Sequence, residues 1–535
     1  MSSNRPSMQF SDRLRRSTTL IASLVFMLLW SACSAPAPMG QSYAVPASAP
    51  AASEAPYFGG PSTGGTDPVN DAAYDAVFFK NYGVNPFIDT EDDHLSTFAM
   101  DVDTASYTVA RRYLTDGNLP DPDSVRVEEF VNYFKHDYTP PTPEEGAFAI
   151  HLEGSPAPFG GERYSLMRVG LQAQVIDAAD RKDASLVFVI DTSGSMDMEN
   201  RLGLVKRTLG LLVDELRPTD EVAIVEYGSR ARLILPPTSG EDKDAIRQGI
   251  NGLVSNGSTN AEEGLRMGYD LAARMAQPGR ITRIILCSDG VANVGHTGPE
   301  RILRTIRERS DSQGISLSTV GFGMGNYNDI LMEQLANDGD GNYAYVDTLE
   351  EARRIFVGNL TGTLQVVAKD AKIQVDFNPE VVSRYRLLGY ENRRVDDDDF
   401  RNDEVDAGEV GAGHSVTALY EVKLAQNESL DASEETVATV YIRYADPDTG
   451  EVSEVSQAIS RSQFAATFGE SPVDFQRDAA VAEFAEILRE SYWAQDGDLA
   501  SVRRLAQSAA VGLADDADMA EFVYLVTQAE RIGSW

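Results

Sequence analysis

Five oxygen-bearing side chains in three short segments have the types and spacing of metal ligands. They are Asp191, Ser193 and Ser195 in Asp-Thr-Ser-Gly-Ser, Thr259 in Asn-Gly-Ser-Thr-Asn, and Asp289 in Ser-Asp-Gly. Carboxylates and hydroxyls are hard donors, which suit Mg²⁺, Ca²⁺ or Mn²⁺ and disfavour Zn²⁺ or Cu²⁺. With only two carboxylates among the donors, a bound ion keeps positive character and can attract another carboxylate. The set therefore predicts a site for a hard divalent cation.

The segments around these residues predict a parallel sheet that would bring them together. Between residues 185 and 360, apolar runs alternate with helical stretches, which is typical of a doubly wound, Rossmann-like α/β domain. The expected strands are 186–190, 222–227, 284–287 and 315–320, and the expected helices are 199–216, 242–252, 261–276, 299–310 and 328–337. Asp191 and Asp289 come just after two of these strands. We therefore expect both at the carboxyl edge of the sheet, where open α/β sheets bind ligands.

This arrangement resembles the metal-ion-dependent adhesion site of von Willebrand factor type A domains. The resemblance covers residues 185–360, and all five ligand positions are filled. It implies that Ser193 and Ser195 bind the ion directly and that Thr259 engages according to state. It implies that Asp191 and Asp289 bind directly or through water, and that a partner's Asp or Glu takes the remaining position. Mg²⁺ is the expected ion, with Ca²⁺ and Mn²⁺ as alternatives. The alternative without a metal is that Asp191 and Ser193 only cap the next helix and that Thr259 and Asp289 only fill turns.

The amino terminus has the order of an export signal. Residues 13–16 contain three arginines and precede an apolar run at 20–30, which is followed by Ser-Ala-Cys ending at Cys33. The segment resembles a bacterial lipoprotein signal, which implies a signal peptide at 1–33 and lipid on Cys33. Residues 34–69, rich in Ala, Pro and Ser, then predict a flexible tether. We expect a lipid anchor in the bacterial cell envelope, facing the periplasm or the exterior; an uncleaved anchor and plain secretion are the alternatives.

Composition narrows the function further. The chain of 535 residues has 83 acidic and 46 basic residues, a formal net charge of -37. Such a chain would repel a phosphate backbone, so nucleic acid is not an expected partner. Its length predicts several domains, and its 42% hydrophobic content is ordinary for a protein that folds in water. If Cys33 carries lipid, Cys287 is left alone, and its apolar neighbours predict a buried thiol.

The regions on either side of the central domain predict further modules. A small helical module is expected at 70–145, with helices at 104–114 and 125–134. Strands are expected at 146–180, a β-sandwich-like region at 366–465 and helices at 472–535. We expect the strands before and after the central domain to pair, so that this domain is inserted between them. In the last module, one helix face is expected to comprise Phe475, Phe484, Ile487, Leu488 and Tyr492, and a second face Phe522, Leu525 and Val526.

Segments in these flanks extend the resemblance. Residues 96–98, 101–107, 384–392 and 411–414 look like the terminal regions of a family of bacterial lipoproteins built around a type A domain. That family's flanking regions imply no activity. The resemblance then spans nearly the whole chain after the expected signal.

An enzyme and a structural protein are the two alternatives to a metal-dependent binding protein. Asp101-Val-Asp-Thr resembles the nucleophile motif of haloacid dehalogenase-type phosphatases, but Ala105 stands where that motif has Thr or Val, and the small module that follows lacks the room for a phosphatase core. Helix capping by Asp103 or Thr104 explains these residues better. No nucleophile elbow surrounds Ser193. We therefore expect no enzyme, and a hydrolase with activity in the flanking regions is the less favoured alternative. The structural alternative is a metal site that locks the protein's own domains together, with an internal Asp or Glu such as Asp101 or Asp103 as the sixth ligand.

Overall fold

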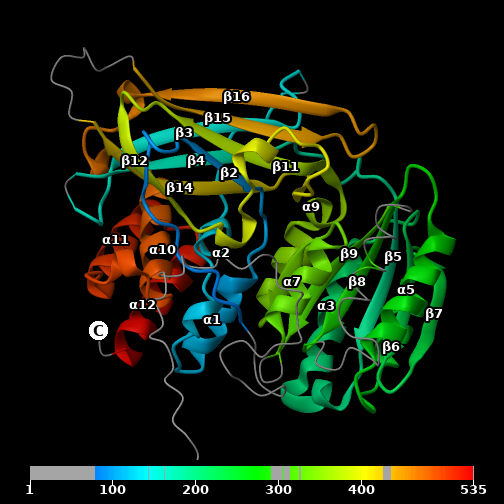
Figure 1. The fold of residues 1–535 in the computed structure, drawn as a ribbon. Helices are drawn as coiled ribbons and strands as arrows, with labels where there is room; N and C mark the ends of the chain where they lie inside the picture. Colours follow the sequence, from blue (N-terminus) through cyan, green and yellow to red (C-terminus); the bar gives the residue numbers. More distant parts are fainter. Residues whose placement is uncertain are drawn as a thin grey trace, which may run out of the picture. The chain divides into compact units, whose positions relative to one another are not determined.

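The described part of the chain contains three β-sheets and the helices around them (Figure 1). The structure is a computed structural model that describes residues 79–142, 144–161, 163–290, 304, 306, 314–323, 327–425 and 435–533. The expected signal peptide and tether lie outside these residues, as does the expected helix at 299–310 apart from residues 304 and 306. None of the described helices is long and apolar enough to cross a membrane.

The central domain is built on a six-stranded sheet with the order β10-β9-β8-β5-β6-β7. Its strands are β5 (Ala184–Asp191), β6 (Glu221–Tyr227), β7 (Ala231–Ser239), β8 (Ile281–Ser288), β9 (Ile315–Phe322) and β10 (Tyr343–Val346). Within this sheet, β7 is antiparallel to β6 and the other neighbours are parallel. The expected doubly wound α/β fold is confirmed. β7 and β10 were not expected, because β7 is an exposed edge strand with two prolines and β10 has only four residues.

Helices cover both faces of this sheet (Figure 1). They are α3 (Arg201–Glu215), α4 (Lys243–Asn251), α5 (Ala261–Met275), α7 (Asp329–Asn337) and α8 (Leu349–Arg353). Side chains of β5 alternate between the two faces: Val187 and Val189 pack in the core that contains α5 and α7, while Phe188 and Ile190 pack in the core that contains α3, α4 and α8. A strand buried on both faces must be apolar throughout, which explains the unbroken run before Asp191.

Two further sheets face each other in a sandwich. One has the order β1-β12-β14-β4-β3, and the other has β13-β11-β15-β16 with β2 also on β11. Their strands are β1 (Ile88–Asp89), β2 (Leu95–Ala99), β3 (Phe148–Pro156), β4 (Ser165–Ala173), β11 (Val366–Phe377), β12 (Val382–Leu388), β13 (Gly408–Gly411), β14 (Ser415–Leu424), β15 (Thr436–Ala445) and β16 (Val452–Ser460). Apolar side chains from both sheets form one core between them.

The sandwich is made from both sides of the central domain in the sequence. β4 precedes that domain, β14 follows it, and the two strands pair antiparallel along their length. The chain segments that enter and leave the domain also touch, because the backbone N–H of Lys182 donates to Gln365 Oε1 at 2.8 Å. The central domain is therefore inserted into the sandwich, with its two ends side by side.

Helices from the two ends of the described chain share one core. They are α1 (Ala105–Thr115), α2 (Val127–Asn132), α10 (Val473–Leu488), α11 (Leu499–Gly512) and α12 (Ala517–Ile532). Their buried side chains, Phe130, Phe484 and Phe522 among them, belong to a single cluster. The expected face of the last module is wrong at Tyr492, which is 68% exposed, because α10 ends at Leu488 and the chain changes direction before Tyr492.

Short helical turns connect these elements. They are η2 (Pro122–Ser124), η3 (Gly194–Asn200), η4 (Arg354–Gly358), η5 (Glu391–Arg393), η6 (Asp397–Asp399), η7 (Arg461–Gln463), η8 (Phe468–Glu470), η9 (Tyr492–Ala494) and α9 (Leu360–Leu364). Of these, η4 is a single π-helical turn and the others labelled η are 3-10 turns.

A buried ion-pair network ties the helical core to the sandwich. Asp478 of α10 is fully buried and accepts from Arg168 Nη1 of β4 at 2.8 Å, from Arg477 Nη2 at 3.1 Å and from His136 Nε2 at 2.9 Å. Burial by itself would raise the pKa of Asp478, but its interactions with His136, Arg477 and Arg168 outweigh burial and hold the pKa well below the usual range. The carboxylate is therefore compensated where it is buried.

Asp478→Asn should lower the free energy of unfolding by about 3–5 kcal/mol, because it leaves buried guanidinium groups short of a charge partner. Asp474→Asn is the matched control: Asp474 also contacts Arg168 but keeps 28% of its side chain exposed, so its loss should cost less than about 1 kcal/mol. Urea unfolding measures both. A carboxyl with a lowered pKa stabilises the fold above its ordinary pKa, so the advantage of the wild-type protein should shrink as the pH falls below about 4. Equal effects of the two substitutions would contradict this role.

Candidate metal centre

Asp191 lies at the carboxyl end of the central strand β5 and is fully buried. Its Oδ1 accepts from the backbone N–H of Ser193 and its Oδ2 from the Ser288 hydroxyl, each at 2.8 Å. Burial and the neighbouring Asp289 raise the pKa of Asp191 to about 6. These hydrogen bonds hold the carboxylate in place but do not compensate its charge.

Three of the other expected ligands lie in a row beside Asp191. Ser193 Oγ is 3.0 Å from Ser195 Oγ, and Ser195 Oγ is 3.1 Å from Asp289 Oδ1, which follows the end of β8. Adjacent ligands of an octahedral Mg²⁺ with bonds of 2.0–2.1 Å are also about 3 Å apart. The hydroxyl oxygens and the carboxylate could therefore move from hydrogen bonds with one another to a shared ion with little rearrangement. The donor set and its spacing fit a small, hard divalent cation.

Backbone hydrogen bonds attach the loop of Thr259 to this row. Gly194 N–H donates to Gly257 O at 3.0 Å, and Asn256 N–H donates to Thr192 O at 2.6 Å. The Ser255 hydroxyl donates to Ser193 O at 2.7 Å. The structure therefore brings the three loops together, and Thr259 is half-buried.

Arg201, the first residue of α3, adds a charge that the sequence motif does not include. Its Nη1 lies 2.7 Å from Asp289 Oδ2, and both side chains are buried. Burial raises the pKa of Asp289, while Arg201 and Ser195 act in the opposite direction. The sequence did not predict that Arg201 would contact Asp289 or that Ser288 would contact Asp191. Ser288 adjoins Asp289 in the motif, but no spacing rule singles out an arginine ten positions after Asp191.

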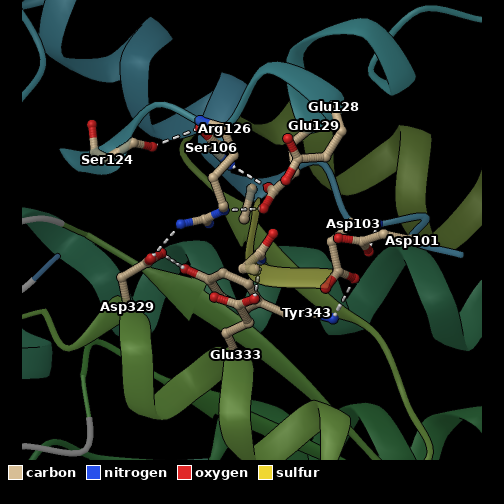
Figure 2. Close-up of polar contacts among 12 residues, drawn as sticks. Asp101, Asp103, Ser106, Ser124, Arg126, Glu128, Glu129, Asp329, Glu333 and Tyr343 are labelled. Atoms are coloured by element: carbon tan, nitrogen blue, oxygen red, sulfur yellow. Dashed lines mark hydrogen bonds and ion pairs between the residues drawn. The ribbon is translucent and has the colours of Figure 1, made fainter. Parts of the chain in front are cut away.

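Asp101 and Asp103 do not lie at this site, so they cannot serve as its internal sixth ligand. Asp103 Oδ1 accepts from the N–H of Tyr343 at the start of the edge strand β10 (Figure 2). β10 is three strands from β5 in the sheet, which corresponds to about 14 Å. Both carboxylates are buried and pair with Arg393. The structural alternative that used these two residues is therefore wrong, because α1 and the turn before it pack on the sheet's edge.

Cys287 lies in β8 and is fully buried, and burial raises the pKa of its thiol to about 12. This agrees with a core residue rather than a reactive thiolate. Cys33 lies outside the described residues.

Arg201→Gln should tighten binding of Mg²⁺ at this site about tenfold, because it removes a positive charge that a cation must approach closely. Isothermal titration calorimetry measures the affinity. Arg207→Gln is the control, since Arg207 is exposed on the same helix and the change in net charge is the same. Weaker Mg²⁺ binding by Arg201→Gln would instead mean that Arg201 mainly orients Asp289.

Comparisons with known proteins cover nearly all the described chain. Three family models match: von Willebrand factor at residues 73–168, von Willebrand factor type A domain at 185–357, and the C-terminal region of uncharacterized protein YfbK at 362–532. Uncharacterized protein YfbK of Escherichia coli (strain K12) is 37% identical over 474 residues, which are 85% of this chain and 81% of that protein.

Two further matches are more distant. Human inter-alpha-trypsin inhibitor heavy chain H4 is 31% identical over 165 residues, 29% of this chain and 17% of that protein. A solved structure, von Willebrand factor type A from Catenulispora acidiphila, is 16% identical with a TM-score of 0.42, over 71% of this chain and 89% of that one. Type A domains are commonly metal-dependent adhesion or protein-interaction modules. The E. coli relative and the family models together show that this chain belongs to the bacterial family of von Willebrand factor type A domain proteins that includes YfbK.

Proposed function

We propose that the chain is an envelope-anchored protein-binding protein. A divalent cation, Mg²⁺ first, bridges its adhesion site to an Asp or Glu of a partner protein. The observation that carries the proposal is the row of Ser193, Ser195 and Asp289 oxygens, spaced at 3.0 and 3.1 Å beside the buried Asp191. When bound, the ion supplies the positive charge that attracts the partner's carboxylate. The residues of this chain hold the ion and leave one side of it open.

The open side is the side of Ser195 and Thr259. Both are half-buried, whereas Asp191, Ser193 and Asp289 are buried. The same two loop regions carry exposed apolar side chains, since Met198 is 50% and Val254 is 67% exposed. When a protein surface covers such apolar side chains, they exclude water from the contact that they surround. These features support a protein partner rather than a small anion, and binding rather than turnover.

Asp191→Ala should abolish cation-dependent capture of partners while the fold stays intact, because it removes a buried carboxylate whose charge the protein does not compensate. The assay is a pull-down from a bacterial envelope extract with Mg²⁺ or with EDTA. Circular dichroism and the unfolding midpoint check the fold. Asp197→Ala, an exposed acidic residue of the same loop, is the matched control and should behave as the wild-type protein. Recovery of the same partners by Asp191→Ala, or by the wild-type protein in EDTA, would rule out the metal bridge.

We also propose that lipid on Cys33 holds the chain at a membrane. The sequence from residue 13 to residue 33 supports this, with its arginines, its apolar run and the small residues before the cysteine. The following tether would let the folded part reach a partner away from the membrane surface.

Cys33→Ser should abolish incorporation of radiolabelled palmitate and move the protein from the membrane fraction to the soluble fraction after export. The physical reason is that serine offers no thiol for the lipid, and an acyl chain supplies most of the membrane affinity. Cys287→Ala is the control, since the buried Cys287 should leave labelling unchanged. Persistent membrane association of unlabelled Cys33→Ser would favour an uncleaved anchor instead.

A further inference from the structure

Three buried carboxylates meet where α2, the sandwich and the central domain join. Asp101 is 5% exposed, and Glu128 and Glu129 are each 1% exposed. One oxygen of each lies within 4.8 Å of the others. Figure 2 shows Glu128 and Glu129 side by side on their helix, with Asp101 and Asp103 on the neighbouring segment. Ligand oxygens on a Ca²⁺ ion with bonds of about 2.4 Å are separated by at most about 4.8 Å.

Hydrogen bonds fix the direction of each of these carboxylates. Asp101 Oδ2 accepts from Arg393 Nε at 2.9 Å, and Glu129 Oε2 accepts from the Ser106 N–H at 2.7 Å. Glu128 Oε2 accepts from the Tyr390 N–H at 3.0 Å. Each oxygen has a second lone pair for a cation, so none of these bonds has to break when an ion binds.

The backbone conformation at Tyr390 places its N–H against Glu128. Gly389 and Tyr390 both have positive φ, 84° and 64°. A Cβ at Gly389 would lie 2.4 Å from Glu128 Oε2 and 2.7 Å from Glu128 N. Tyrosine rarely adopts this conformation, so packing must hold it there. The strained turn therefore holds the Tyr390 N–H within hydrogen-bond distance of Glu128.

One oxygen of the group has no partner at all. Glu128 Oε1 is buried and makes no hydrogen bond in the described structure. A buried carboxylate oxygen without a partner is costly, because water no longer solvates it. Glu128 belongs to the group of three carboxylates that each have one oxygen within 4.8 Å of the others. This buried, unpartnered oxygen points to a cation-binding group rather than to an ordinary acidic cluster.

The surroundings are also short of positive charge. The carboxylates of Asp101, Asp103, Glu129, Asp329 and Glu333 pair with two buried guanidinium groups, those of Arg126 and Arg393. Glu128 makes an ion pair with neither, and Arg489, which interacts with Glu128 electrostatically, is already paired with Glu391 and Glu486. Lys80 adds one interaction with Glu333. Burial and the neighbouring carboxylates raise the pKa of both Glu128 and Glu129. A divalent cation would supply the charge that the protein does not.

From the oxygen set, the unpartnered Glu128 oxygen and the charge balance, we propose that Asp101, Glu128 and Glu129 bind a second divalent cation. All three offer hard oxygen ligands, which fits the Ca²⁺, Mg²⁺ and Mn²⁺ class. This cation is structural. It joins α2 to the segment after β2, and through Arg126–Asp329 and Arg393–Glu333 it fixes both to α7 of the central domain. It is independent of the adhesion site.

A second acidic group does not carry the same proposal. One oxygen each of Asp370, Asp406 and Glu409 also lie within 4.8 Å of one another. Asp406 is exposed, however, and none of the three has a buried oxygen left without a partner among the described residues.

The test counts cations bound by the full chain. Equilibrium dialysis against Mn²⁺ uses the double variant Asp191→Asn, Asp289→Asn, in which the adhesion site is disabled. This protein should retain about one tightly held equivalent at the junction, and further substitution Glu128→Gln, Glu129→Gln should remove it. Asp396→Asn with Asp398→Asn, which neutralises two exposed acids, is the matched control and should retain it.

A count that is the same with and without Glu128→Gln, Glu129→Gln would overturn the proposal, as would binding that does not saturate by about 1 mM Mn²⁺. Either result would mean that Glu128 and Glu129 are neutralised by protons and not by a bound cation. Should the quadruple variant fail to fold, anomalous scattering from Mn²⁺ in crystals of the wild-type chain decides the matter. A peak between Asp101, Glu128 and Glu129 supports the site, and its absence at full occupancy of the adhesion site overturns it. If the wild-type chain shows this peak but captures no partner protein, the proposed function is refuted and the second cation site stands.

Discussion

The pairing of β4 with β14 is the constraint on which the rest of the structure depends. These strands come from opposite sides of the central domain, so their pairing holds both ends of that domain in one sheet. The contact between Lys182 and Gln365 brings the entering and leaving chain together at the amino end of β5. Asp191 is at the other end of the same strand, about 23 Å away for eight residues. The insertion therefore presents the adhesion site at the end of the domain that is remote from its attachment.

Buried carboxylates in this protein fall into two groups with different physical roles. Asp478 and Asp220 are surrounded by donors and cations, which hold their pKa below the usual range. Asp191 and Glu128 are also buried, but their pKa is raised because their charge is not fully compensated. Asp478 stabilises the junction between the helical core and the sandwich, and Asp220 holds the start of β5 in the central domain. Carboxylates that remain uncompensated in an oriented oxygen cluster are candidates for cation ligands, and the two cation sites we propose both lie at such clusters.

Local patterns predicted the central domain well because their cause is local. The apolar run ending at Asp191 belongs to a strand buried on both faces, and Asp242, Asn260 and Asn328 each cap the helix that follows them. β7 and β10 escaped prediction because edge strands need no such pattern. Arg201 escaped for a related reason: its contact with Asp289 depends on where α3 begins relative to β8, and nothing in the spacing encodes that. Tyr492 has the helical spacing of the preceding apolar residues, but the helix ends at Leu488.

By itself, the sequence determined the type A fold, the chemistry of the five candidate ligands and their place at a sheet edge, because parallel strands put their carboxyl ends together. Tertiary structure alone decided what surrounds them. It merged helices from both ends of the described chain into one core, since each helix has an apolar face that it cannot bury alone. It placed Asp101 beside Glu128 and Glu129 instead of beside Asp191, because packing on the edge strand β10 depends on contacts between residues far apart in the chain.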